Sequence, residues 1–206
     1  MTLQRLEIEF EPIPLPDEVT KLLTAFSPYV EEHRVDIAND YRGFVPCDYE
    51  MAYQCLKTLR ASYELCGYRF CEWGSGLGVV ASLAALVGFE SYGIERGKEI
   101  AILSQQLAKE NSISVDLVCG SFIPEGSDQI VDEAYSANDG DIALYTEADD
   151  AYAELGMDID CFDLIFAFPW PNDLELVKQL FAEYAASGAV LMTYNDRDKF
   201  TLLRKT

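Results

Sequence analysis

Residues 71–81 of the chain read Cys71-Glu72-Trp73-Gly74-Ser75-Gly76-Leu77-Gly78-Val79-Val80-Ala81. This stretch connects an aromatic-rich run typical of a strand, at 68–73, to an apolar run typical of a helix, at 79–87. Glycines allow the backbone to turn tightly and let a ligand approach the main chain without a Cβ in the way. The first turn of a helix offers free N–H groups to a polar ligand. The stretch therefore predicts a ligand-binding turn.

An acidic residue follows at the end of the next expected strand. Residues 91–94 have the composition of a short strand, and Glu95 comes directly after it, 17 positions beyond Gly78. A carboxylate in that place can accept hydrogen bonds from both hydroxyls of a ribose. The alternative is a glycine-rich turn and a surface glutamate without a ligand. A glycine turn, a strand, an acid and a following helix in this order favour an adenosine-containing ligand.

The pattern along the chain predicts an α/β fold. From Tyr68 onward, short apolar runs alternate with amphipathic runs of helical period, which is typical of a doubly wound, mostly parallel, Rossmann-like sheet. We expect strands at 68–73, 91–94, 115–119, 161–168 and 189–194, and helices at 79–87, 98–110 and 174–184. Residues 1–60 form an expected N-terminal helical cap or lid segment, and 61–206 form the expected ligand-binding domain, within one compact domain overall. Residues 124–160 are interpreted as a partly helical insertion.

Two classes of adenosine ligand fit the glycine turn. Glu72-x-Gly74-x-Gly76-x-Gly78 resembles motif I of the class I S-adenosylmethionine-dependent methyltransferases, in which an acid precedes three alternating glycines. Gly76-x-Gly78-x-x-Ala81 also satisfies the dinucleotide fingerprint for NAD(P) or FAD. We favour the methyltransferase class because an acid before the first glycine suits a cofactor with an ammonium group, which a dinucleotide lacks.

Two later segments support the same resemblance. Gly120-Ser121-Phe122 resembles the Gly-Asp-aromatic turn that holds adenine in many methyltransferases, and Phe168-Pro169-Trp170-Pro171 resembles motif IV, where these enzymes place their target. Together with a Phe-Val-Pro-x-Asp-Tyr stretch at 44–49, the chain is similar to a little-described bacterial subgroup with an aromatic-Pro-Trp-Pro motif IV.

The resemblance implies S-adenosylmethionine as cofactor and assigns site residues. The methionine part of the cofactor would lie against the glycine turn, the ribose on Glu95, and adenine at the turn after the third strand of the alternating pattern. The expected cofactor-binding residues are Glu72, Gly74, Ser75, Gly76, Gly78, Glu95, Ser121 and Phe122. The expected contacts to the methyl acceptor are Asp48, Tyr49, Phe168, Pro169, Trp170 and Tyr194. Tyr41 is a further lid candidate, Asp48 is also interpreted as a helix cap, and Trp170 as a core aromatic. No catalytic residue is assigned.

The chain departs from the family pattern at three places. Ser121 stands where motif III usually has Asp, so the contact to adenine is weaker or comes from the backbone. Phe168 stands where the amine methyltransferases have Asp or Asn, which argues against an exocyclic base amine as acceptor. The C-terminal end is shortened, because 12 residues follow Tyr194 and leave room for one closing strand at 199–204.

These features leave three hypotheses in order of preference. The first is an S-adenosylmethionine-dependent methyltransferase acting on a small molecule or a protein. The second is a non-catalytic protein of methyltransferase fold that binds cofactor or a partner, which the substitutions in motifs III and IV favour. The third is an NAD(P)-dependent oxidoreductase. Against it, the chain has neither a Tyr-x-x-x-Lys pair after the nucleotide motif nor a separate substrate domain.

The charge of the chain bears on its partners. The 206 residues carry 15 Lys and Arg against 36 Asp and Glu, a net charge of −21. This balance argues against nucleic acid as a partner, since binding phosphates needs clustered Lys and Arg. From Glu110 to Val177 there are 17 acidic residues and no Lys or Arg. This segment is either a solvated face or a negative rim that favours a cationic acceptor.

Other classes of site have no support in the sequence. The six cysteines form no Cys-x-x-Cys pair and His33 is the sole histidine, so no metal site is expected. Scattered cysteines without a leader sequence are typical of reduced residues in a cytoplasmic protein. The longest mostly apolar run, 77–89, is shorter than the roughly 20 residues that a membrane helix needs. We interpret His33 as a surface residue, and the oligomeric state is not indicated.

Overall fold

The computed structural model describes residues 2–10, 13–33, 45–137, 144, 147, 149, 151–195 and 199–206. Across these residues, seven strands form one sheet in the order β1-β7-β6-β5-β2-β3-β4. The five strands of the alternating pattern, β2 to β6, are parallel to their neighbours in that group. The strands are β1 (Leu3–Leu6), β2 (Arg69–Trp73), β3 (Glu90–Glu95), β4 (Val115–Cys119), β5 (Leu164–Ala167), β6 (Val190–Asn195) and β7 (Lys199–Lys205).

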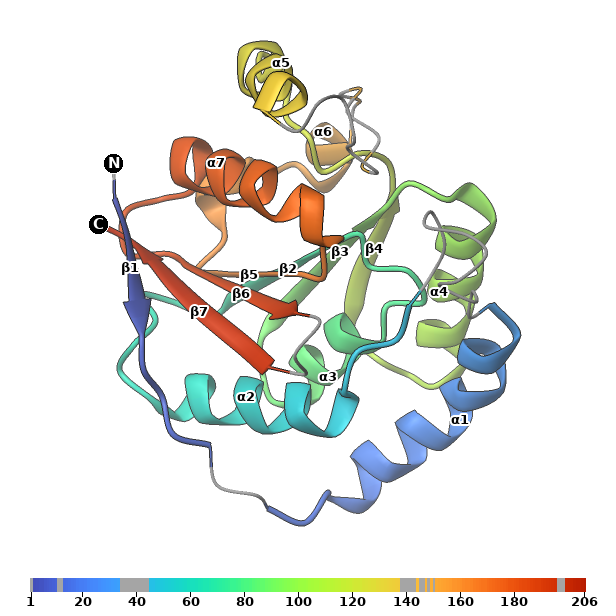
Figure 1. The fold of residues 1–206 in the computed structure, drawn as a ribbon. Helices are drawn as coiled ribbons and strands as arrows, with labels where there is room; N and C mark the ends of the chain where they lie inside the picture. Colours follow the sequence, from blue (N-terminus) through green and yellow to red (C-terminus); the bar gives the residue numbers. More distant parts are fainter. Residues whose placement is uncertain are drawn as a thin grey trace.

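Helices cover both faces of this sheet (Figure 1). One face carries α1 (Asp17–His33), α2 (Tyr49–Ala61), α3 (Val79–Leu86) and α4 (Lys98–Glu110), and the other carries α5 (Asp128–Ala137), α6 (Ala151–Leu155) and α7 (Leu174–Tyr184). Short 3-10 turns lie at Ile159–Cys161 and Pro171–Asp173. Each face has its own apolar core, because successive side chains of a strand point to opposite faces. In β2, Phe70 packs into the core under α2 and α3, while Cys71 and Trp73 pack into the core under α7.

The order of the strands reverses at β2. From β2 the chain continues to β3 and β4 on one side, and then returns to place β5 and β6 on the other side. Ligands of open α/β sheets bind outside the carboxyl ends of the strands at such a reversal point. The glycine turn 74–78 follows β2. It therefore occupies the position that this architecture uses for binding.

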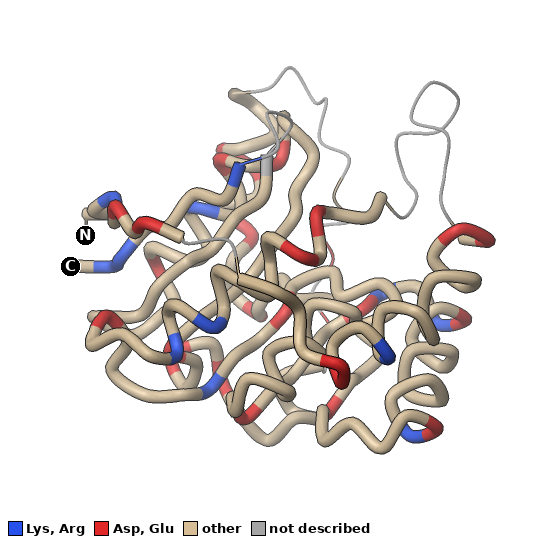
Figure 2. Tube along the Cα trace, turned by 90° about the horizontal axis from the view of Figure 1, so that it is seen from below, with Lys and Arg blue, Asp and Glu red and all other residues tan. Residues whose placement is uncertain are grey.

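The N-terminal residues complete the far edge of the sheet. β1 pairs antiparallel with β7, and β7 pairs antiparallel with β6, so β1 runs in the same direction as β2 to β6. The two ends of the chain lie together in Figures 1 and 2. Thr206 N–H donates to the carbonyl of Thr2 at 3.0 Å, which fixes this edge.

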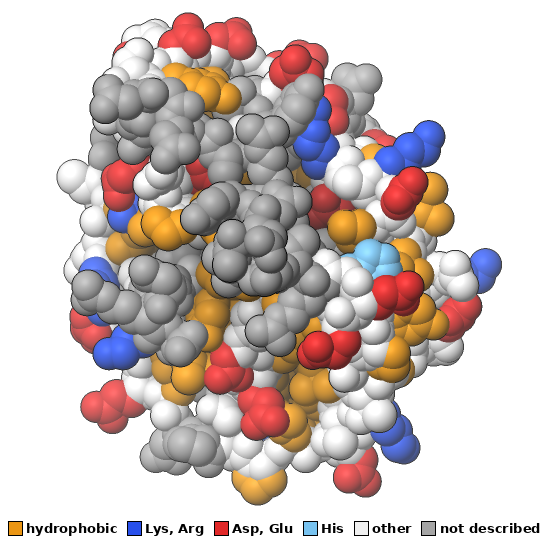
Figure 3. All heavy atoms as spheres, turned by 45° about the vertical axis from the view of Figure 1, so that its right-hand side comes forward, with side chains coloured by type: hydrophobic (Ala, Val, Ile, Leu, Met, Phe, Trp, Pro, Cys, Tyr) orange, Lys and Arg blue, Asp and Glu red, His pale blue; other side chains and the backbone are white. Residues whose placement is uncertain are grey.

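Most of the expected elements are confirmed, including the closing strand at 199–204 and helices within the insertion at 124–160. The N-terminal region contains the expected helices α1 and α2, but also β1, which the sequence pattern did not predict. Among the described residues, none of the helices is both long and apolar enough to cross a membrane. On the face in Figure 3, acidic side chains stand singly or in small groups among other residues.

Candidate functional site

The glycine turn rests on the end of β3. Gly74, Gly76 and Gly78 have φ values of 70°, 52° and 69°, in the left-handed region that favours glycine. The N–H groups of Gly74 and Ser75 both donate to the carbonyl of Ile94 at 2.9 Å. This turn needs a glycine at position 93 as well, because a Cβ there would lie 2.9 Å from Ser75 Cβ. The loop is thus held rigidly against the neighbouring strand.

Glu95 ties the same loop to the exit of its own strand. Its Oε2 accepts a hydrogen bond from Gly76 N–H and its Oε1 accepts one from Gly97 N–H, each at 2.7 Å. A carboxylate has about four lone-pair sites, so two remain for a ligand. The side chain is half-buried and therefore reachable. The position suits a group that offers two adjacent hydroxyls.

Glu72 is a buried carboxylate beneath the first turn of α3. It is 5% exposed, and its Oε2 accepts a hydrogen bond from Ala81 N–H at 2.7 Å. Burial raises the pKa of this carboxyl well above its usual value, and nearby Glu95 raises it further, while the bond from Ala81 opposes the shift. A cationic group placed beside Glu72 would offset the cost of burying its charge.

Ser75 has a hydroxyl without an internal partner. The residue is 3% exposed, and its Oγ hydrogen-bonds no group among the described residues. Buried hydroxyls are nearly always hydrogen-bonded in folded proteins, because an unsatisfied one costs about 1–3 kcal/mol. The hydroxyl of Ser75 is therefore available to a polar group of a ligand at this loop.

The turn after β4 lies beside the end of β3, because the two strands are paired. Ser121 and Phe122 are both buried, and Ser121 Oγ accepts from Ile123 N–H at 3.1 Å. The Phe122 ring stacks on Trp73, with centroids 5.0 Å apart and an interplanar angle of 4°. Phe122 is thus anchored by the last residue of β2, directly before the glycine turn.

Three residues that the sequence interpretation missed shape this turn. Asp149 accepts a hydrogen bond from Ser121 N–H, and Tyr152 donates one to the carbonyl of Phe122 at 2.8 Å. Trp73 is the third. Trp73 stands between Glu72 and Gly74, so its place in the motif was a usable signal. Asp149 and Tyr152 come from the insertion, which has no period or motif that points to a site.

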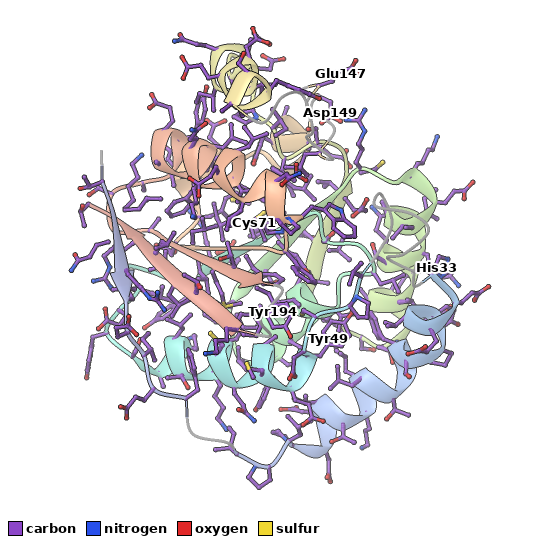
Figure 4. All side chains as sticks on the ribbon, in the orientation of Figure 1. His33, Tyr49, Cys71, Glu147, Asp149 and Tyr194 are labelled. Carbon is purple, nitrogen blue, oxygen red and sulfur yellow. The ribbon has the colours of Figure 1, made fainter. Side chains whose placement is uncertain are left out.

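Of the residues expected to contact the acceptor, one caps a helix and two pack against the core. Asp48 is exposed and caps α2, since its Oδ1 accepts from Met51 N–H at 2.9 Å; the helix-cap interpretation is confirmed. Tyr49 and Tyr194 pack against the same core cluster (Figure 4). Burial raises the pKa of the Tyr49 phenol, and the neighbouring Cys47 and Glu72 add to the effect. Tyr49 is therefore close enough to Glu72 for the charge of that carboxyl to act on its phenol.

Aromatic side chains gather where β5 and β6 end: Phe168 directly follows β5, Tyr194 lies near the end of β6 and Phe200 lies near the start of β7. Phe168 meets Tyr194 edge to face at 5.0 Å between ring centroids, and Tyr194 meets Phe200 at 4.9 Å. Pro169 and Trp170 are half-buried, and the carbonyl of Trp170 accepts from Asp173 N–H at 2.9 Å. Because Ala167 of β5 lies opposite Trp73 of β2, the chain that follows β5 begins beside the glycine turn. Phe168, Pro169, Trp170 and Tyr194 are called the aromatic wall below.

The structure therefore brings the expected cofactor residues together at the carboxyl ends of β2, β3 and β4. The expected acceptor residues gather at the ends of β5 and β6 and at the start of α2. Tyr41 and Phe44 lie outside the described residues. His33, at the end of α1, is half-buried and its Nδ1 lies 2.9 Å from the carbonyl of Tyr29 (Figure 4). Within the described ranges, no group of three His, Cys, Asp or Glu side chains is arranged to hold a metal ion.

Comparison with known proteins agrees with this architecture. No protein-family model and no curated protein sequence matches the chain. Among solved structures, an RNA methyltransferase from Salinibacter ruber in complex with S-adenosyl-L-homocysteine aligns with a TM-score of 0.51 and 16% identity, over 79% of this chain and 93% of that one. The S-adenosylhomocysteine-bound methyltransferase PaMTH1 from Podospora anserina aligns with a TM-score of 0.51 and 12% identity, over 87% of this chain and 62% of that one. The chain has the fold of the S-adenosylmethionine-dependent methyltransferases.

Proposed function

We propose that the protein is a methyltransferase that uses S-adenosylmethionine and acts on a small molecule or a protein. The observation that carries the proposal is the Glu95 carboxylate, which bridges Gly76 and Gly97 and keeps two lone-pair sites for a ribose. It lies one strand away from the glycine turn, at the reversal point of the sheet where this fold binds its ligands.

The residues around the turn fit this cofactor. Glu72 offers a buried carboxyl group to the ammonium group, and Ser75 offers a hydroxyl without an internal partner to a polar group. Glu95 would hold the ribose, and the turn at Ser121 and Phe122 would take the base. When bound, the cofactor supplies an electrophilic methyl group on a sulfonium. The chain's own contribution is to orient the reactants and exclude water.

The acceptor would enter along the aromatic wall. Phe168 gives this position no carboxylate or amide to accept a hydrogen bond from an amine, so we do not favour an exocyclic base amine. Trp170 offers an aromatic face, which attracts cations. Phe168, Pro169 and Trp170 of this wall belong to the acid-rich segment 110–177. These features support a cationic acceptor, such as an amine or a basic peptide, and the net charge argues against nucleic acid.

A second candidate function is cofactor binding without catalysis. The observation that favours it is Phe168 at the expected target position, where no acid or amide is present. Turnover to S-adenosylhomocysteine that depends on an added amine and disappears in Gly76→Arg would exclude this alternative.

Thermal unfolding in the presence of candidate ligands tests the class of function. A ligand at 100 times its Kd stabilises the native state by about 2.7 kcal/mol. We expect S-adenosylmethionine and S-adenosylhomocysteine to raise Tm and NADH to leave it unchanged. Stabilisation by NADH alone would support an oxidoreductase, and no stabilisation by the two sulfur compounds would contradict the proposal.

A further inference from the structure

Asp149 joins the insertion to the turn after β4. Its Oδ1 accepts hydrogen bonds from Ser121 N–H at 2.7 Å and from Ala151 N–H at 3.1 Å. Figure 4 labels Asp149 next to α6. The second oxygen, Oδ2, takes no hydrogen bond from any of the described residues. One oxygen therefore holds the backbone of the turn, and the other is available as an acceptor.

The turn is built to receive this side chain. A Cβ at Gly120 would lie 2.6 Å from Asp149 Oδ1 and 2.7 Å from Ala151 Cβ, distances that real Cβ atoms do not reach. Position 120 must therefore be glycine for Asp149 to approach. The bond from Tyr152 to the carbonyl of Phe122 holds the same two segments together a second time.

The place of Asp149 follows from the position of Glu95. β3 and β4 are neighbours, and Gly120 N–H donates to the backbone carbonyl of Glu95 at 2.9 Å. A ribose on the Glu95 carboxylate has β2 on one side, where the glycine turn and Glu72 stand. With its other substituent on that side, the ribose would direct its base to the opposite side, toward the end of β4, about one strand spacing (~4.8 Å) away.

We infer that Asp149 reads the base of the cofactor by accepting a hydrogen bond from its exocyclic amino group through Oδ2. The inference rests on the proposed function. The exocyclic amino group of adenine is an N–H donor. Hypoxanthine has a carbonyl oxygen in place of that amino group, and a carboxylate repels it. Asp149 is thus a specificity-determining residue that selects adenosine over inosine ligands. The insertion supplies this carboxylate to a turn that itself carries Ser121.

Binding of S-adenosylhomocysteine and S-inosylhomocysteine to the full chain tests the inference. We expect the wild type to bind the adenosyl compound at least tenfold more tightly. Asp149→Asn keeps an oxygen for Ser121 N–H but replaces the free acceptor with an N–H₂ donor, so the preference should fall below threefold or reverse. The control Glu154→Gln, an exposed residue of α6, should keep the wild-type ratio.

A purely structural role would give a different result. If Asp149 only supported the turn, Asp149→Asn would keep the wild-type ratio, which would overturn the inference. Asp149→Ala, which loses both roles, should weaken binding of the adenosyl compound more than that of the inosyl compound; an equal loss for the two would also contradict us. Failure of the wild type to bind either compound would instead overturn the proposed function.

Discussion

Glu72 has two opposing effects at the residue scale, one on stability and one on binding. Its pKa is raised in the folded protein because the carboxyl is buried. The folded state thus holds the proton more tightly than the unfolded chain does. The contribution of Glu72 to stability is therefore fully present below the unfolded pKa of about 4.5, and it is lost as pH rises toward the folded pKa.

We predict that Glu72→Gln stabilises the free protein and weakens cofactor binding. The amide oxygen can still accept from Ala81 N–H, but no charge is buried. Tm at pH 8 should rise by roughly 2–4 °C, the shift that accompanies about 1 kcal/mol, and its dependence on pH should flatten. Affinity for S-adenosylmethionine should fall at least tenfold, since hydrogen bonds to charged groups contribute about 1.5–3 kcal/mol. Unchanged affinity would argue against the ammonium contact.

The glycines of the turn give a second prediction at this scale. Gly74 and Gly78 have nearly equal φ values, +70° and +69°, but a Cβ at Gly78 would lie 3.0 Å from Leu117 Cδ1, and one at Gly74 has nothing within 4 Å. Gly74→Ala should cost about 1–2 kcal/mol of backbone strain. Gly78→Ala should cost more because it adds the contact with Leu117. Urea unfolding measures both, and a lower cost at Gly78 would contradict the described packing.

Residues that lie in ordered sequence patterns could be predicted, and residues brought in from the insertion could not. Glu72, the glycines and Glu95 follow from their positions relative to strands and a helix. Asp149 is one acid among the 17 of segment 110–177, and its contact with Ser121 spans 28 positions. A single sequence gives no signal for such a pairing.

At the element scale, the parallel strands were predictable because they are short, apolar and separated by amphipathic helices. β5, for instance, is fully buried, as expected for a central strand. β1 was missed because it is four residues long and has two exposed positions. Its apolar content is too small for a strand signal, and its position depends on pairing with β7 at the other end of the chain.

A buried lysine of β7 holds the C-terminal end of α7. Lys205 in β7 is 4% exposed, and its Nζ donates to the carbonyl of Glu183, at 3.0 Å, and to that of Ala185. A cation at a helix C-terminus also interacts favourably with the helix dipole. Lys205→Met should therefore lower the free energy of unfolding by about 1.5–3 kcal/mol. Lys199→Met, at the exposed start of the same strand, should change it little; equal effects would contradict this role.

At the scale of the whole molecule, the two ends of the chain together form one edge of the sheet. β7 lies between β6 and β1, so loss of β1 would expose its backbone along the edge of the sheet. Exposed edge strands promote pairing with other chains. The two ends thus protect the sheet far from the site.

Deletion of residues 2–8 should therefore destabilise the protein and promote self-association. We expect Tm to fall by roughly 4–8 °C, the equivalent of about 2 kcal/mol, and elution in size-exclusion chromatography to shift to larger species than for the full chain. S-adenosylhomocysteine should still bind, because the site lies at the carboxyl ends of β2 to β4. A truncated chain as stable and as uniform as the full one would show that β1 contributes nothing.

Titration calorimetry with S-adenosylhomocysteine on the wild type, Glu95→Gln and Glu90→Gln tests cofactor binding most directly. Glu95→Gln keeps one acceptor oxygen but sets an N–H₂ donor against Gly76 or Gly97, and it removes the charge from the ribose site. Glu90 lies at the opposite end of the same strand, so it is the matched control. We predict one-to-one binding to the wild type and Glu90→Gln, and at least tenfold weaker binding to Glu95→Gln. Equal affinities in all three proteins, or no binding to the wild type, would contradict the site described.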